Sequence, residues 1–147
     1  MFKILLADDN VKIRTLTKAL IETRKDFTVC GEANDGVEAI SKAIKLKPDL
    51  VIVDFAMGLL NGLQVGTRLS KTLPDLPIIL HSVYGFTAMV SEAKKAGIRE
   101  VVTKAESGDA LLDAIDRCLN KAERPGTLLL DIQSSDGEQP KEPPKVD

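Results

Sequence analysis

Acidic, hydroxyl and ammonium side chains stand at the ends of four separate apolar runs. Asp8 and Asp9 follow FKILLA, Asp54 follows LVIV, Ser82 closes PIILHS, and Lys104 follows VVT. The runs have the length and apolar content of strands in a parallel sheet, and two are apolar nearly throughout, as strands covered on both faces are. Ligands bind at the carboxyl ends of such strands, so we expect these five side chains to meet at one edge.

Three carboxylates at one edge raise one another's pKa and lower stability unless a cation neutralises them. Oxygen ligands without a neighbouring histidine or cysteine suit a hard ion such as Mg²⁺, which takes only one or two carboxylates. Taken alone, Asp8 or Asp9 is more simply interpreted as a helix cap. Asp54 ends a strongly apolar strand, where an unpaired carboxylate is unfavourable. The agreement of four strand ends therefore favours a magnesium site.

Residues 2–122 alternate five times between a short apolar run and a stretch of helical periodicity. The expected strands cover residues 2–7, 27–31, 50–55, 77–82 and 98–104. The expected sheet-facing residues of the helices are Ile13, Leu16 and Leu20 after a cap at Asn10; Val37, Ile40, Ala43 and Ile44 after Asp35; Leu63, Leu69 and Leu73; Ala88, Met89 and Ala93; and Leu111, Leu112, Ile115 and Leu119 after Ser107. Right-handed crossovers then predict an α/β fold, a five-stranded parallel sheet doubly wound by helices on both faces.

The composition is that of one ordinary globular domain. The 147 residues are 44% hydrophobic with a formal charge of -2, which argues against a disordered chain or a polycation that binds nucleic acid by charge. No apolar run approaches the roughly 20 residues of a membrane-spanning helix, and MFKILLADDN turns acidic too early for a signal peptide. We expect a cytoplasmic protein. Cys30 and Cys118 lack the spacing of a disulfide framework or zinc site.

Residues 123–147 differ in character from the rest and contain four of the seven prolines. We predict a polar, Pro-rich tail without a packed core. Its apolar hexamer TLLLDI, residues 127–132, is a candidate for docking as an added strand or contacting a partner. We favour the simpler interpretation of a linker that lies on the surface.

Over residues 2–122 the sequence resembles the response-regulator receiver family. The matching features are Asp8 and Asp9, Asp54 followed by Met57 and Gly62, Ser82, and Lys104. The resemblance implies a flavodoxin-like (βα)5 three-layer sandwich in which Asp54 accepts a phosphoryl group. It further implies that Asp9 and Asp54 bind Mg²⁺ directly, that Asp8 helps through water, and that the backbone carbonyl of Ala56 completes the protein ligands.

The remaining roles follow from this resemblance. Lys104 and Mg²⁺ would offset charge on the phosphoryl oxygens, and Ser82 would bond to the aspartyl phosphate and shift an equilibrium between inactive and active states. The alternatives are a surface lysine and a capping serine. The implied donor is a sensor histidine kinase or phosphotransfer protein. The implied output is a protein target or a second copy, docked on the fourth helix, fifth strand and fifth helix; the domain signals and is not an enzyme.

Several positions depart from the family pattern. Gly58 stands where proline commonly follows the methionine. Ala105 replaces the proline often found after the lysine, which disfavours a cis peptide there because a non-proline cis bond costs about 3 kcal/mol. Val101 occupies the place of an aromatic residue that moves with the hydroxyl residue, so that read-out cannot operate as such. Tyr84 and Phe86 are candidates to replace it, although ordinary packing is the simpler interpretation.

Two further residues bear on the site. Ala56 and Tyr84 flank the phosphoryl position in the family pattern, so we expect the lifetime of the phosphorylated state to depend on them. His81, the only histidine, precedes Ser82, and strand alternation points it away from the site. We therefore interpret His81 as a packing residue and not as a base or phosphohistidine.

Competing functions remain on the same fold. A phosphatase of the haloacid dehalogenase type needs a second aspartate where Ala56 stands, and a dinucleotide module needs a GxGxxG that is absent. The tail is too short for a packed DNA-binding domain. The chain is therefore a stand-alone receiver or the receiver fragment of a longer DNA-binding regulator. A receiver-like module independent of phosphorylation has no physical reason to keep a repulsive cluster.

Overall fold

Five strands form one parallel sheet in the order β2-β1-β3-β4-β5. The computed structural model describes residues 1–83, 85 and 87–123. The strands are β1 (Phe2–Ala7), β2 (Phe27–Ala33), β3 (Leu50–Val53), β4 (Ile78–Ser82) and β5 (Glu100–Thr103). The neighbouring interior strands β1 and β3 pair in register from Ile4 with Leu50 to Ala7 with Val53. This register brings the residues that follow both strands to the same edge.

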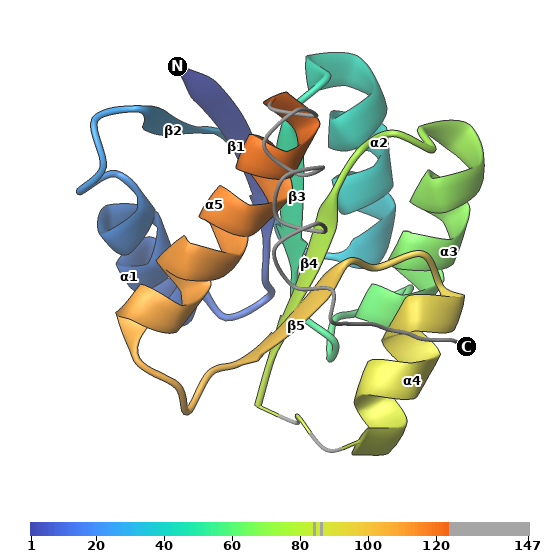
Figure 1. The fold of residues 1–147 in the computed structure, drawn as a ribbon. Coiled ribbons are helices and arrows are strands. Elements are labelled where there is room, and N and C mark those ends of the chain that lie inside the picture. Colours follow the sequence, from blue (N-terminus) through green and yellow to red (C-terminus); the bar gives the residue numbers. More distant parts are fainter. Residues whose placement is uncertain (84, 86, 124–147) are drawn as a thin grey trace, which may run out of the picture.

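Five helices cover the two faces of the sheet, as Figure 1 shows. They are α1 (Val11–Ile21), α2 (Gly36–Leu46), α3 (Gly62–Thr72), α4 (Thr87–Lys95) and α5 (Gly108–Glu123). Helices α1 and α5 lie on one face, and α2, α3 and α4 lie on the other. The predicted five-stranded, doubly wound three-layer sandwich is confirmed.

The sheet separates two hydrophobic clusters because successive strand residues point to opposite faces. Leu5, Val51 and Val53 pack with α2, α3 and α4, whereas Ile4 and Ile52 pack with α1 and α5. Strand β3 is buried throughout, as its uninterrupted apolar sequence predicts. Asp54 therefore follows a fully buried central strand.

Polar caps fix where the helices begin. The Asn10 side chain accepts a hydrogen bond from the Ile13 amide at 3.0 Å, and the Asp35 side chain accepts one from the Glu38 amide at 2.8 Å. The predicted cap at Asn10 is confirmed. Asn61 and Gln64 form a reciprocal capping box at the start of α3, which fixes the end of the loop that follows Asp54.

The expected helix faces are only partly right. Leu16 is 70% exposed, and Val37, Ile44 and Ala88 are also exposed. Helix α2 buries Ala43, as predicted, together with Gly36 and Ala39, because small side chains let its backbone approach the sheet. Strand β2 extends two residues beyond the expected end and β5 starts two residues later than expected. The chain has no cis peptide bond among the described residues, in agreement with the expectation for Ala105.

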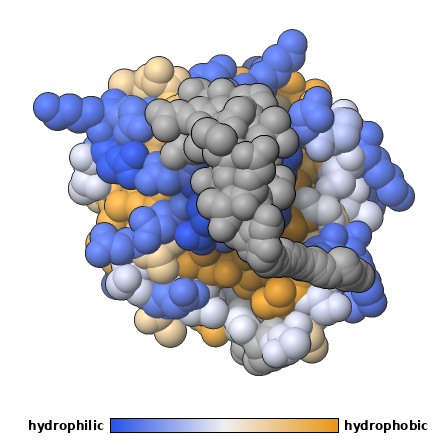
Figure 2. All heavy atoms as spheres, in the orientation of Figure 1, coloured by the Kyte–Doolittle hydropathy of each residue, from blue (hydrophilic) through white to orange (hydrophobic). Residues whose placement is uncertain are grey.

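The surface mixes polar and apolar residues. In the view of Figure 2, hydrophilic side chains project around the rim, with hydrophobic residues between them. None of the described helices is both long and apolar enough to span a membrane. The boundary at residue 122 stays a prediction, and the candidate docking segment 127–132 lies outside the described residues.

Candidate functional site

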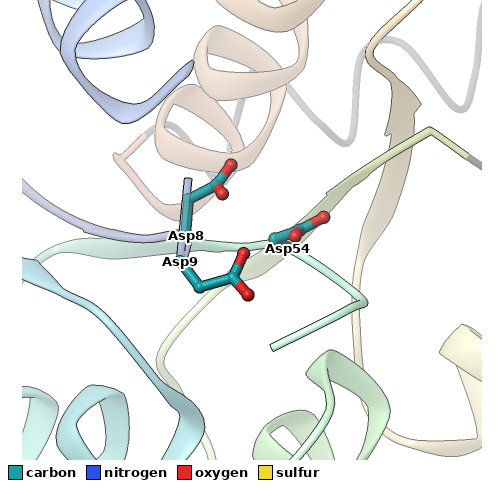
Figure 3. Close-up of side chains that lie close together, drawn as sticks. All are labelled: Asp8, Asp9 and Asp54. Atoms are coloured by element: carbon teal, nitrogen blue, oxygen red, sulfur yellow. The ribbon is translucent and has the colours of Figure 1, made fainter. Parts of the chain in front are cut away.

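Three carboxylates meet at the carboxyl edge of the sheet, as Figure 3 shows. Asp8, Asp9 and Asp54 each offer one oxygen, and these oxygens all lie within 4.8 Å of one another. The backbone explains the meeting, because the Asp54 amide donates to the Ala7 carbonyl at 3.0 Å across the β1–β3 pair. Asp8 and Asp54 are only 4% and 7% exposed, whereas Asp9 is exposed to solvent. The cluster therefore has two buried carboxylates and one open to approach.

Lys104 reaches into this cluster from the end of β5. Its ammonium lies 2.7 Å from the Asp8 carboxylate and 3.2 Å from the Asp54 carboxylate, and its side chain is largely buried. Its backbone amide donates to the Ser82 carbonyl at 2.7 Å. The geometry is not that of a surface lysine, and it supplies one positive charge to three carboxylates.

Burial raises the pKa of Asp54 above its ordinary value. The Lys104 ammonium opposes this shift, and the neighbouring Asp8 carboxylate adds to it. The upward shift in the pKa of Asp54 agrees with the expected repulsion between carboxylates, although burial contributes more to the shift than the neighbouring negative charges do. Removal from water leaves the Asp54 carboxylate poorly solvated, and this makes it a more basic oxygen nucleophile.

The other expected site residues that the structure describes lie on β4, on β5 and in the loop after Asp54. Ser82 is 1% exposed and ends β4, the strand between β3 and β5. Val101 is half-buried and packs against the cluster shared with α2, α3 and α4. Ala56 is exposed in the loop after Asp54. Tyr84, the third switch candidate, lies outside the described residues, as does Phe86.

Hydrogen bonds tie down the loop between Asp54 and α3. The Gly62 amide donates to the Phe55 carbonyl at 2.8 Å, and the Gly36 amide donates to the Gly58 carbonyl at 3.2 Å. Leu59, with φ of 70°, adopts the left-handed conformation at the tip of the loop. The segment that carries Ala56 is therefore held at both ends, with backbone strain at Leu59 between them.

Sequence reasoning missed Arg14, a residue of α1. Its guanidinium donates to the Asp8 carbonyl at 2.6 Å and to the Glu32 carboxylate at 2.8 Å. No spacing rule connects an arginine in a helix with a backbone carbonyl six residues earlier. The available signal was Glu32, an acidic residue directly after the second apolar run.

His81 is partly buried on the sheet face covered by α1 and α5, where it pairs in register with Val102. Burial, with a smaller contribution from the nearby Lys104 ammonium, lowers the pKa of His81 to about 4. The imidazole is therefore neutral at physiological pH, which accords with a packing role.

A family model described as a response regulator receiver domain matches residues 4–116. This match spans well over half of the chain. The chain belongs to the response-regulator receiver family. The predicted family is thereby confirmed, and the receiver fold with it.

Curated relatives of this receiver domain include two chemotaxis proteins CheY. One, from Listeria monocytogenes, is 32% identical over 80% of this chain and 98% of its own length. The other, from Thermotoga maritima, is 35% identical over 78% of this chain and 95% of its own length. The response regulator protein VraR of Staphylococcus aureus is 32% identical over 77% of this chain, but the match covers only 54% of VraR.

Solved structures of receiver domains superimpose on this one. The response regulator domain of Thermotoga maritima CheB matches with a TM-score of 0.76 and 30% identity, over 82% of this chain and 97% of that one. A LuxR-family two-component response regulator from Aurantimonas matches with a TM-score of 0.80 and 26% identity, over 82% of this chain and 86% of that one.

The donor set of this receiver domain fits a hard divalent cation. The grouped oxygens come from carboxylates alone, and Mg²⁺ prefers oxygen at about 2.1 Å, so ligands on opposite sides lie about 4.2 Å apart. The observed grouping within 4.8 Å is close to this span. Receiver domains typically bind Mg²⁺ at such an acidic pocket.

Proposed function

We propose that this chain is a phosphorylation switch in which Asp54 accepts a phosphoryl group from a histidine kinase, a phosphotransfer protein or a small phosphodonor. One observation carries the proposal: Asp54 is a buried carboxylate with a raised pKa, placed 3.2 Å from the Lys104 ammonium and beside two further carboxylates. A structural aspartate gains nothing from neighbours of the same charge. Membership of the receiver family supports the same role.

The transfer needs positioning more than covalent machinery. An Asp54 carboxylate oxygen attacks phosphorus in line, the bond from phosphorus to the donor nitrogen or oxygen breaks, and its electron pair leaves with the donor. Lys104, already within contact of Asp54, offsets the negative charge on a phosphoryl oxygen. Mg²⁺, held by Asp9, Asp54 and the Ala56 carbonyl with Asp8 acting through water, would neutralise further charge on the phosphoryl oxygens.

Ser82 is the proposed switch residue. Its hydroxyl would donate to the aspartyl phosphate, and its carbonyl already accepts a bond from the Lys104 amide, so the ends of β4 and β5 respond together. Val101 has no ring to move between buried and exposed positions. The read-out therefore depends on backbone movement of these strand ends, with Tyr84 as a further candidate.

The output we propose is a protein contact in the cytoplasm, made by α4, β5 and α5 with a target or a second copy of the chain. In this proposal the chemistry of the domain is confined to phosphorylation and dephosphorylation of Asp54. We assign no direct nucleic-acid or membrane contact to this segment. In a longer regulator, comparable to VraR in length, the same surface would control a following domain.

Intact-mass analysis tests the acceptor. Wild-type protein incubated with Mg²⁺ and an excess of a small acyl phosphate, then quenched with acid, is expected to gain one phosphoryl group. Asp54→Asn is expected to gain none, while Asp75→Asn, a matched change at an exposed loop position, behaves as wild type. An unmodified wild-type mass under donor excess, or full modification of Asp54→Asn, would show that the acceptor is wrongly assigned.

A further inference from the structure

Arg14 connects three elements around the backbone of the acidic site. Besides its bonds to the Asp8 carbonyl and Glu32, its guanidinium lies 3.3 Å from the Asn34 side-chain oxygen just beyond β2. Its side chain is only 15% exposed in the ion pair with Glu32. The planar guanidinium suits this task because it donates in fixed directions to separate acceptors.

The carbonyl that Arg14 holds belongs to the peptide bond between Asp8 and Asp9. The Asp8 amide donates to the Ala33 carbonyl at 3.1 Å, so the end of β2 controls both sides of Asp8. The Asp8 carboxylate is fixed separately, by the Asn10 amide at 2.9 Å and by Lys104. Within the described residues, no hydrogen bond or ion pair holds the Asp9 carboxylate. Its direction therefore depends on the orientation of the preceding peptide.

We propose that Arg14 is a positioning residue for the metal site: it anchors the Asp8–Asp9 peptide to β2 and so aims the Asp9 carboxylate at the cluster. This inference rests on the proposed magnesium site. Partners that orient a metal ligand without touching the metal commonly change metal affinity by about 10–100-fold when removed. Arg14 occupies that place in relation to Asp9.

The direction in which Mg²⁺ affinity changes when Arg14 is removed distinguishes a positioning role from a purely electrostatic one. A positive guanidinium near a cation site repels the cation, so its removal through charge alone would tighten Mg²⁺ binding. Glu32 balances this charge locally, and the hydrogen bond from Arg14 lowers the pKa of Glu32. If Arg14 acts by holding the peptide, its removal must weaken Mg²⁺ binding even though the site becomes more negative.

Magnesium titration by calorimetry tests this inference on the full chain. We expect Arg14→Ala to bind Mg²⁺ about tenfold more weakly than wild type. Arg14→Lys keeps the charge but cannot reach both acceptors from one ammonium, so we expect an intermediate affinity. The matched control is Arg24→Ala, which loses ion pairs with Asp26 and Asp116 and a contact with the Phe27 ring, all away from the site. We expect it to lose stability and keep the wild-type affinity.

Unchanged or tighter binding by Arg14→Ala would overturn the inference, and so would an equal loss in Arg24→Ala. If Arg14→Ala does not fold, Arg14→Lys decides alone, since wild-type affinity in that variant would equally overturn it. A wild-type protein that binds no Mg²⁺ would instead refute the metal site on which the inference rests. The two failures are therefore distinguishable in one set of titrations.

Discussion

Gly62 places the first turn of α3 against the backbone of Asp54, the proposed phosphoacceptor, so Gly62→Ala tests how tightly that contact is made. An added Cβ would lie 2.6 Å from the Asp54 carbonyl oxygen, 2.7 Å from Leu80 Cδ1 and 3.0 Å from Phe55 Cα. Ordinary contact begins near 3.4 Å, so α3 and β3 must separate by up to about 0.8 Å. Two of the three obstacles are backbone atoms and the third belongs to a fully buried side chain, so none can move freely.

This separation affects both stability and chemistry. Overpacking of this kind destabilises a fold by about 1–3 kcal/mol. It also displaces Asp54 relative to Lys104 and Asp9, and a misplacement of about 1 Å can reduce a rate up to about 100-fold. We therefore expect Gly62→Ala to unfold about 2 kcal/mol more easily in urea, and to be phosphorylated by a small donor on the order of tenfold more slowly.

Gly58→Ala is the control in the same loop. An added Cβ there meets no atom within 4 Å, and φ at Gly58 is outside the left-handed region. Reduced freedom of the unfolded chain should leave this variant as stable as wild type or up to about 1 kcal/mol more stable. Equal stability and equal phosphorylation rates for the two alanine variants would show that α3 does not pack directly on the backbone of Asp54.

Three further outcomes follow from the site and its surroundings. Mg²⁺ should raise the melting temperature of wild type by relieving repulsion between carboxylates, and Asp9→Asn should lose at least part of that rise; an undiminished rise would remove Asp9 from the ligands. The pKa of His81 falls from 6.5 to about 4 on folding, so its unfolded form binds a proton first and stability declines as the pH falls below 6.5. Between pH 7 and pH 5, the free energy of unfolding of wild type in urea should fall by about 2 kcal/mol from this cause, and His81→Gln should lack that fall. An equal fall in both proteins would contradict a neutral, buried imidazole. Leu59→Gly should stabilise the fold by about 0.5–1 kcal/mol in the same assay because it removes a left-handed leucine that is 76% exposed, and a destabilised variant would show that the side chain makes a needed contact.

The sequence predicted the sheet because a parallel strand covered on both faces leaves an unmistakable apolar run, as Val51 and Ile52 illustrate. It predicted helix faces less well. Leu16 is apolar but faces solvent, while Thr17 is buried because its hydroxyl donates to the Ile13 carbonyl within the helix. Apolar spacing alone does not reveal that a polar side chain can satisfy its hydrogen bond locally and so occupy the buried face.

The meeting of the strand-end residues was predictable for a different reason. Parallel strands deliver their carboxyl ends to one edge, so Asp8, Asp54 and Lys104 had to approach one another once the strands were identified. Arg14 had no such rule. Its contacts depend on the path of α1 over the end of β2, which only the packed structure defines.

Lys104 connects the acidic cluster to the end of β4. Its ammonium is shared between Asp8 and Asp54, while its backbone amide holds the Ser82 carbonyl. A phosphoryl group on Asp54 would compete with Asp8 for that ammonium, because phosphoryl oxygens carry more negative charge. Any shift of Lys104 toward the phosphoryl group pulls on the ends of β4 and β5 through the Ser82 carbonyl. In the proposed switch, Lys104 would therefore both neutralise the transferred group and link it to β5, the strand beside α4 and α5, without need of an aromatic ring at Val101.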